Sequence, residues 1–213
     1  SSNTDGSINT TTTSVNTTAG ISISTFEGNG TAGATIGHGL GVAPSVVINK
    51  SRDNGTGRGW GVYHVAQGPT KYAELNNTDP FYTGSTRWNN TAPSSTVITL
   101  GSQQTTNDNA SMVSYAFAEI EGFSKFGSYT GNGSTDGPFI YTAFKPAFLV
   151  AKRVDSADNW AMYDAARDPY NVAEKYLLAD NSAAEATYST AKVDFLSNGF
   201  KWRGAVNFGN NSS

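Results

Sequence analysis

The chain has 213 residues, of which 37% are hydrophobic and only 15% are charged, with 23 glycines and no cysteine. This length can bury a core as one large or two smaller β domains, and the lack of cysteine excludes disulfide scaffolds, cysteine zinc sites and thiol chemistry. The formal net charge of −3 provides no basic footprint for nucleic acid or an anionic membrane. No stretch has the roughly 18 apolar residues of a membrane span, so we expect no membrane insertion. Abundant Thr, Ser and Asn favour short strands joined by turns, which predicts an all-β protein.

The first 24 residues differ in composition from the rest of the chain. Residues 1–24 are rich in Thr, Asn and Ser and hold almost no large apolar side chain before Ile21. Such a segment buries too little surface to fold alone. We expect an extended arm that lies along the domain or a neighbouring subunit, or else a linker from an upstream domain.

From residue 25 the chain reads as one unit of about 100 residues written twice. Matching strings recur in the same order at a nearly constant offset: GNGT at 28 and GNGS at 131, APSVVINKS at 43 and KPAFLVAKR at 145, GWGVYH at 59 and NWAMYD at 159, and KYAELNN at 71 and KYLLADN at 175. A period of this length is that of a domain and not of a solenoid repeat. We therefore predict an antiparallel β-sandwich built from two tandem, homologous copies, residues 25–123 and 124–213.

Each copy is expected to run through the same local elements. A Gly-Asn-Gly turn opens the copy, and a short apolar strand follows a proline, Pro44 or Pro146. A further turn leads to an aromatic strand in which neither face is strongly polar, which indicates a central strand covered on both sides. The only plausible helical stretch, residues 172–186, is expected to form a turn or two at most.

The two copies differ in completeness. The first closes with SMVSYAFAEIEGF at 111–123, and the second ends without a counterpart to that strand. Because proteins avoid unpaired strand edges, the gap needs a partner. We expect the natural polypeptide to continue past this end; donation of the strand by a neighbouring subunit or by the N-terminal segment remains the alternative.

Catalytic side chains form no recognisable constellation. His38 lies among glycines, and His64 is matched in the second copy by Asp164, so both are interpreted as polar residues that make local hydrogen bonds. No nucleophile elbow is present. The carboxylates considered as a glycosidase pair are Glu119 with Glu121, or the group Asp155, Asp158, Asp164 and Asp168. Such a pair needs a defined separation across a sugar cleft, which sequence spacing does not supply. We predict a protein that is not an enzyme.

Two turns are rich in oxygen ligands, residues 51–57 and residues 155–159. Calcium needs six or more oxygens, and neither turn has the spacing of an EF-hand loop. Asp, Asn and Gly are also the residues that tight turns require. We interpret both segments as turns and expect no metal and no cofactor.

A long loop at residues 79–95 offers the only candidate ligand-binding residues, Phe81, Tyr82, Arg87 and Trp88. Aromatic side chains and arginine on a loop suit recognition of a sugar or a protein. The alternative is that Trp88 folds back as a lid on the sandwich. On the binding hypothesis, alanine at Arg87 or Trp88 leaves folding intact.

Several strings resemble a duplicated β domain found in tail-fibre and other virion structural proteins of tailed bacteriophages, especially marine and cyanobacterial phages. They are GATIGHGLGVAPSVVINKSRD at 33, WGVYH at 60, YAFAEIEGFSKFGSYTGNGSTDGPFIYTAFKPAFLVAKR at 115 and VDFLSNGFKWR at 193. The resemblance covers nearly all of residues 22–208, and EGFSKFGSYTGNG, which joins the copies, is its most specific element. It implies a setting in the virion and brings no catalytic motif.

The resemblance, with a rigid acidic β unit, favours a non-enzymatic virion structural protein, part of a tail fibre or appendage used in host attachment. The alternative is a capsid decoration or head-fibre protein; a glycan-binding lectin or adhesin and a tail-spike depolymerase are further alternatives. Expected partners are other virion proteins and copies of the chain itself, as a homotrimer, because three-fold packing closes a slender shaft. A host surface glycan or protein is a possible receptor, and nucleic acid is not an expected partner. The expected location is the surface of the virion, after synthesis in the host cytoplasm.

Overall fold

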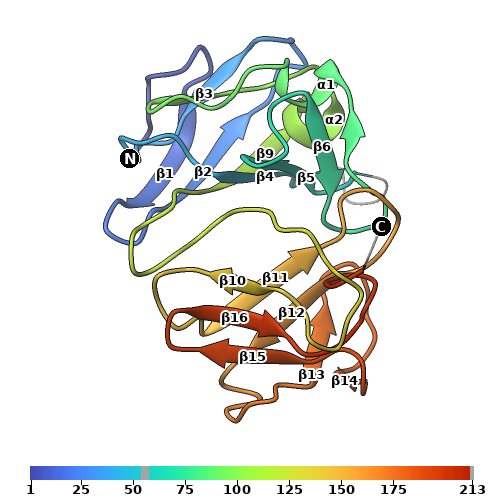
Figure 1. Ribbon diagram of the computed structural model, residues 1–213. Helices are drawn as coiled ribbons and strands as arrows, with labels where there is room; N and C mark the ends of the chain where they lie inside the picture. The colour runs from blue at the N-terminus through green and yellow to red at the C-terminus, as the bar shows by residue number, and fades with distance from the viewer. Residues whose placement is uncertain (54–57, 212–213) are drawn as a thin grey trace. The chain divides into compact units, whose positions relative to one another are not determined.

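The computed structural model describes residues 1–53 and 58–211. The protein is almost entirely β, with antiparallel sheets packed together, which confirms the predicted all-β sandwich class. The chain divides into two compact units, the first formed by residues 1–74 and 81–127 and the second by residues 75–80 and 128–213 (Figure 1). None of the described helices is long and apolar enough to cross a membrane.

The first unit contains a seven-stranded sheet and a smaller sheet that packs on it. The large sheet has the order β1 (Thr10–Asn16), β2 (Ile21–Glu27), β9 (Ser111–Phe117), β4 (Val46–Ser51), β5 (Gly61–His64), β6 (Lys71–Glu74) and β7 (Tyr82–Thr83). The small sheet pairs β3 (Thr35–Gly37) with β8 (Val97–Thr99), and two short helices, α1 (Ser85–Trp88) and α2 (Gln104–Asn107), complete the unit.

Alternation along the strands of the first unit produces its core. Successive side chains of a strand point to opposite faces, so β9 buries Met112, Ser114 and Ala116 on one face and leaves the other half-buried. Met112 and Ala116 meet side chains from the small sheet in a single apolar cluster. The cluster comprises Phe26, Ile36, Leu40, Val47, Tyr63, Trp88, Ile98, Leu100, Met112, Ala116 and Ala118.

The N-terminal segment is part of the first unit. Strand β1 pairs with β2 along the edge of the large sheet, and Ile8 forms a parallel bridge with Ile36. The side-chain hydroxyls of Thr13 and Ser24 lie 3.0 Å apart and join the two strands. Residues 10–16 of the N-terminal segment therefore form an edge strand of the first unit.

The second unit is a smaller sandwich of two sheets. One sheet has the order β10 (Phe139–Tyr141), β16 (Gly199–Trp202) and β15 (Val193–Leu196), and the other has β11 (Phe148–Lys152), β12 (Trp160–Asp164), β13 (Lys175–Leu178) and β14 (Ala186–Thr187). Its core surrounds Tyr163 and Trp202, both 0% exposed. The predicted helical turns at 172–186 are wrong, because this range contributes β13 and the start of β14. Alternate residues of β13 face the core there, and Tyr176 is buried against Tyr163.

The same asparagine clamp occurs in both units. Asn107 is 0% exposed; its Oδ1 accepts the Asn29 backbone N–H at 2.9 Å, and its Nδ2 donates to the carbonyl six residues before it at 3.1 Å. Asn210 makes the corresponding bonds to Asn132 at 2.8 Å and to the carbonyl six residues before it at 3.1 Å. Each clamp ties a Gly-Asn-Gly turn to a segment 78 residues later in the same unit.

One strand pair in each unit has the same register. Val47 of β4 lies opposite Tyr63 of β5, and Leu149 of β11 lies opposite Tyr163 of β12. Both tyrosine rings make edge contacts with a buried tryptophan at 5.9 Å between centroids, but the tryptophan is supplied by α1 in the first unit and by β16 in the second. The central strand predicted from the aromatic stretch at 59–65 is confirmed, because β5 lies between β4 and β6.

Candidate functional site: an apolar strand edge

The predicted ligand-binding residues of the 79–95 loop do not form one surface. Trp88 is 1% exposed and belongs to the core, with its indole against the ring of Tyr63. Phe81 is half-buried, and only Tyr82, in β7, keeps a largely exposed side chain. The prediction of an exposed binding loop is wrong for Trp88, because the short helix α1 turns this residue inward onto the sandwich.

Arg87 is also held inside the first unit. Its Nη2 donates to Oε1 of Glu74 at 2.8 Å, and its guanidinium lies 4.4 Å from the centroid of the Tyr72 ring. Arg87 is only 7% exposed, so its side chain does not face solvent as the binding hypothesis required. A partly buried ion pair and a ring contact fix Arg87 as a structural residue.

Both histidines accept a backbone N–H, as interpreted from the sequence. His38 is buried; its Nδ1 accepts the Leu40 N–H at 3.2 Å, which assigns the proton to Nε2, 3.2 Å from the Ser94 carbonyl oxygen. Burial lowers the pKa of His38, and burial likewise lowers the pKa of His64. His64 ends β5 and accepts the Ala66 N–H at 3.2 Å. The imidazoles are therefore neutral turn-forming groups.

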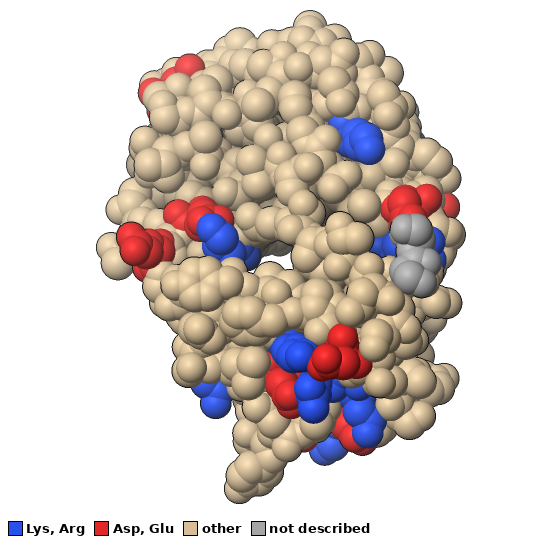
Figure 2. All heavy atoms as spheres, in the orientation of Figure 1, with Lys and Arg blue, Asp and Glu red and all other residues tan. Residues whose placement is uncertain are grey.

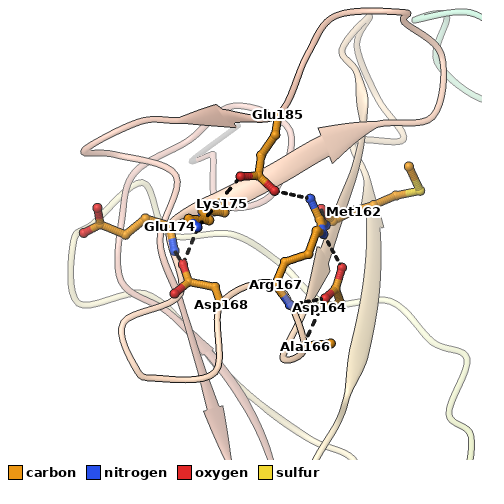
Figure 3. Close-up of polar contacts among 8 residues, drawn as sticks. All are labelled: Met162, Asp164, Ala166, Arg167, Asp168, Glu174, Lys175 and Glu185. Carbon is orange, nitrogen blue, oxygen red and sulfur yellow. Dashed lines mark hydrogen bonds and ion pairs between the residues drawn. The ribbon is translucent and has the colours of Figure 1, made fainter.

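The aspartates of the second unit also bind backbone and cations at turns. Asp164, at the position of His64, accepts the backbone N–H and the guanidinium of Arg167, and the backbone N–H is the larger cause that lowers its pKa. Figure 3 shows Arg167 reaching on to Glu185, at 3.1 Å. In the same view Asp168 accepts the Glu174 N–H at 2.8 Å. This network fastens a turn to two strands and presents no free carboxylate pair.

The other candidate carboxylates have local partners as well. Glu119 accepts the Lys125 ammonium at 2.6 Å, while Glu121 lies exposed in the turn that follows. Asp155 pairs with Arg153 at 2.7 Å, and Asp158 accepts the N–H of its neighbour Asn159 at 2.8 Å. In the turn at 155–159 these carboxylates are thus used to shape the backbone.

The structure describes only part of the other oxygen-rich turn, since residues 54–57 of the 51–57 segment lie outside the described residues. Within residues 1–53 and 58–211, no three histidine or acidic side chains lie close enough together to hold a metal ion.

Strand β11 forms an open edge of the second unit. It pairs only with β12, and its Phe148 and Val150 side chains are 58% and 43% exposed. The matching strand β4 lies between β5 and β9, and there Val46 and Ile48 are half-buried. An exposed apolar strand edge is a template for pairing with another strand, which proteins normally blunt or cover.

The match between β4 and β11 rests on their shared lysine as well as on register. The Lys152 Nζ donates to the Asp158 carbonyl at 2.8 Å, and the Lys50 Nζ donates to the carbonyl of Arg58, so each lysine closes the turn after its strand. Burial lowers the pKa of Lys152. Lys152 therefore stays folded over its own turn and does not place its charge along the edge.

The other sheet of the second unit also has an open edge. Strand β10 ends the three-stranded sheet and exposes Phe139 and Tyr141 at 45% and 62%. At the opposite end of that sheet, β15 is bridged through Val193 to Ala173, just before β13. We call Phe139, Tyr141, Phe148 and Val150 the apolar edge surface.

Charge elsewhere on the molecule is mixed. Figure 2 shows a face on which most atoms belong to uncharged residues and basic groups lie beside acidic ones over the second unit. The ion pairs of the second unit include Lys201 with Asp136 at 2.7 Å and Lys192 with Glu174 at 2.6 Å. Exposed pairs of this kind contribute little to stability, because water and salt screen them. Among the features described, the apolar edge surface is therefore the better candidate for a functional contact.

The apolar edge surface was not predicted from the sequence. The exposure of Phe139, Tyr141, Phe148 and Val150 depends on the order of strands within each sheet, and local sequence does not determine that order.

The comparisons with known proteins return a family and no activity. No curated protein and no solved structure matches the chain. One family model, described as a domain of unknown function (DUF7483), matches residues 1–213. The chain therefore belongs to the DUF7483 family.

Proposed function

We propose that the protein is a non-enzymatic structural component of a tailed-phage virion, part of a tail fibre or similar appendage used in host attachment. The observation that carries the proposal is the apolar edge surface, where two sheets end in unpaired strands with large exposed apolar side chains. Such surfaces become buried when a protein assembles. The resemblance of the sequence to virion proteins supplies the setting.

We also propose that the two units arose by internal duplication. The recurring asparagine clamp, with Asn210 lying 103 positions after Asn107, supports this. The shared register of β4 with β5 and of β11 with β12 supports it further. A duplicated rigid unit suits an extended appendage, because it adds length without new packing solutions.

The titratable side chains favour a structural role over a catalytic one. His38 and His64 accept backbone N–H groups, and Asp164 and Asp168 do the same in the second unit. Glycosidases need two carboxyl groups that face each other across a cleft. Here the carboxylates instead stabilise turns and pair with cations.

The test is to locate the protein on particles of a tailed phage that encodes it, by immunogold labelling or by fitting the two units to a density map. Label at the tail supports the proposal. Label spread over the shell would make the protein a capsid decoration or head-fibre component, and absence from purified particles would overturn a virion role.

The oligomeric state gives a second readout. The mass of one chain is 22.4 kDa. If the protein is a homotrimeric appendage, light scattering is expected to give three times this mass. A two-fold assembly would contradict the homotrimer and leave the virion location to the labelling experiment.

A further inference from the structure

We propose that the open edge of β11 accepts an extended strand from another polypeptide, antiparallel and in the register in which β4 accepts β9. This inference rests on the proposed role as an assembling virion component and names what that assembly places on the edge. In the first unit, β4 is paired with β9. In the second unit, the matching edge of β11 has no strand paired with it among the described residues.

The backbone of β4 shows which residues face the added strand. The Arg52 N–H donates to the Ser111 carbonyl at 2.8 Å, and the register continues with Ile48 opposite Tyr115. Hydrogen-bonded pairs of an antiparallel ladder recur at every second residue, so Ile48 directs its backbone groups at β9. By the match of strands, Val150 directs its N–H and C=O groups at the open edge.

The side chains of β9 define the chemistry of the occupant. Ser114 and Ala116 are buried toward the core, while Tyr115 and Phe117 lie on the other face. Tyr115 stacks on Trp60 with 6.3 Å between ring centroids and 24° between planes. The strand that fits β11 therefore alternates small residues, which enter beside Leu149, with large aromatic residues.

The aromatic residues of such a strand meet an apolar face in the second unit as well. Phe148 and Val150 occupy the positions of Val46 and Ile48, which lie opposite Phe117 and Tyr115. Opposed aromatic and β-branched residues on neighbouring strands stabilise the pairing of those strands. The apolar edge surface is thus complementary to the face that β9 presents.

The chain's own β9 is not available for this role. It is paired along its whole length with β2 on one side and with β4 on the other. Its release would break both ladders and expose buried Met112. The strand that fits the edge of β11 is therefore not β9 itself but one with the same alternation of large and small residues.

The experiment adds a fluorescent peptide with the sequence of residues 110–119, ASMVSYAFAE, to the whole chain and follows its anisotropy. A control peptide has the same composition with the alternation removed. We expect saturable binding of the first peptide, and protection of the β11 amides from hydrogen exchange when it binds. The control peptide is expected to bind at least about tenfold more weakly.

Two variants of one residue separate strand pairing from general stickiness. Val150→Pro removes an N–H that faces outward and so breaks no bond to β12, whereas Val150→Thr keeps the N–H and a β-branched side chain. Thermal melts confirm that both are folded. We expect Val150→Thr to bind as the parent does and Val150→Pro to lose at least tenfold in affinity; Val150→Lys serves if the proline variant fails to fold.

The outcomes decide between the occupants. Equal binding of both peptides, or no loss in the folded Val150→Pro or Val150→Lys variant, would overturn the inference. Self-association of the protein alone that the same variant abolishes would reassign the edge to a second copy of this chain. Failure of peptide binding with the protein found on particles defeats only this inference, whereas absence from particles defeats the proposed function.

Discussion

Replacing Trp88 with alanine is expected to destabilise the first unit strongly. The indole is 1% exposed, lies in the core cluster and meets the Tyr63 ring at 5.9 Å with 70° between planes. Truncation of a buried tryptophan costs about 3–5 kcal/mol, from lost burial and from the cavity that remains. At roughly 2–4 °C per kcal/mol for a chain of this size, the melting temperature should fall by about 6–20 °C.

The matched control is Trp88→Phe. The Nε1 of Trp88 is buried and has no hydrogen-bond partner among the described residues. Leaving such a donor unsatisfied costs about 1–3 kcal/mol, so phenylalanine removes a penalty while keeping much of the ring. The parent and Trp88→Phe should therefore have similar free energies of unfolding, and that of Trp88→Ala should be much lower.

Thermal unfolding followed by circular dichroism and by calorimetry measures this order, with unfolding in denaturant as a second scale. Because Trp88 lies in the core, the fall in melting temperature is expected to be large. A fall of less than about 2 °C for Trp88→Ala would refute it. The 79–95 loop would then have to be reconsidered as an exposed recognition loop.

Three further predictions follow from buried polar groups. Asn107→Ala and Asn210→Ala should each cost more than about 2 kcal/mol in chemical denaturation, because each leaves several buried backbone groups without a partner; a negligible effect of either would show that the clamp in its unit is not needed. The pKa of His38 is lowered in the folded state below the ordinary 6.5, so the unfolded chain binds the proton more readily and stability falls as pH drops below about 6.5. The slope of melting temperature against pH between about 7.5 and 5.5 should be smaller in His38→Gln, and an unchanged slope would assign the effect elsewhere. Arg87→Met should destabilise the fold by about 1–3 kcal/mol because it leaves the Glu74 carboxylate without its guanidinium, and the double variant with Glu74→Gln should recover part of that loss in the same melts.

The local sequence determined the fold class and the central strands. Scarce charge and abundant β-permissive residues predicted an all-β protein, and the aromatic stretch at 59–65 predicted a central strand, because alternation and composition act within a few residues. The turn roles of His64 and Asp164 also followed from local chemistry, since each accepts backbone N–H groups within three residues. The predicted helical turns at 172–186 failed because pairing with neighbouring strands overrides weak helix propensity.

Only the tertiary structure decided which side chains are free to bind. Arg87 and Trp88 are residue types that are common in recognition loops. The short helix α1 instead directs Arg87 at Glu74 of β6 and Trp88 at Tyr63 of β5. The apolar edge surface was likewise hidden, because whether an apolar strand is covered depends on its neighbours in the sheet and not on its own residues. Ile48 and Val150 are β-branched residues at matching positions of β4 and β11. Ile48 is half-buried because β9 pairs with β4, whereas Val150 is exposed because no described strand pairs with that edge of β11.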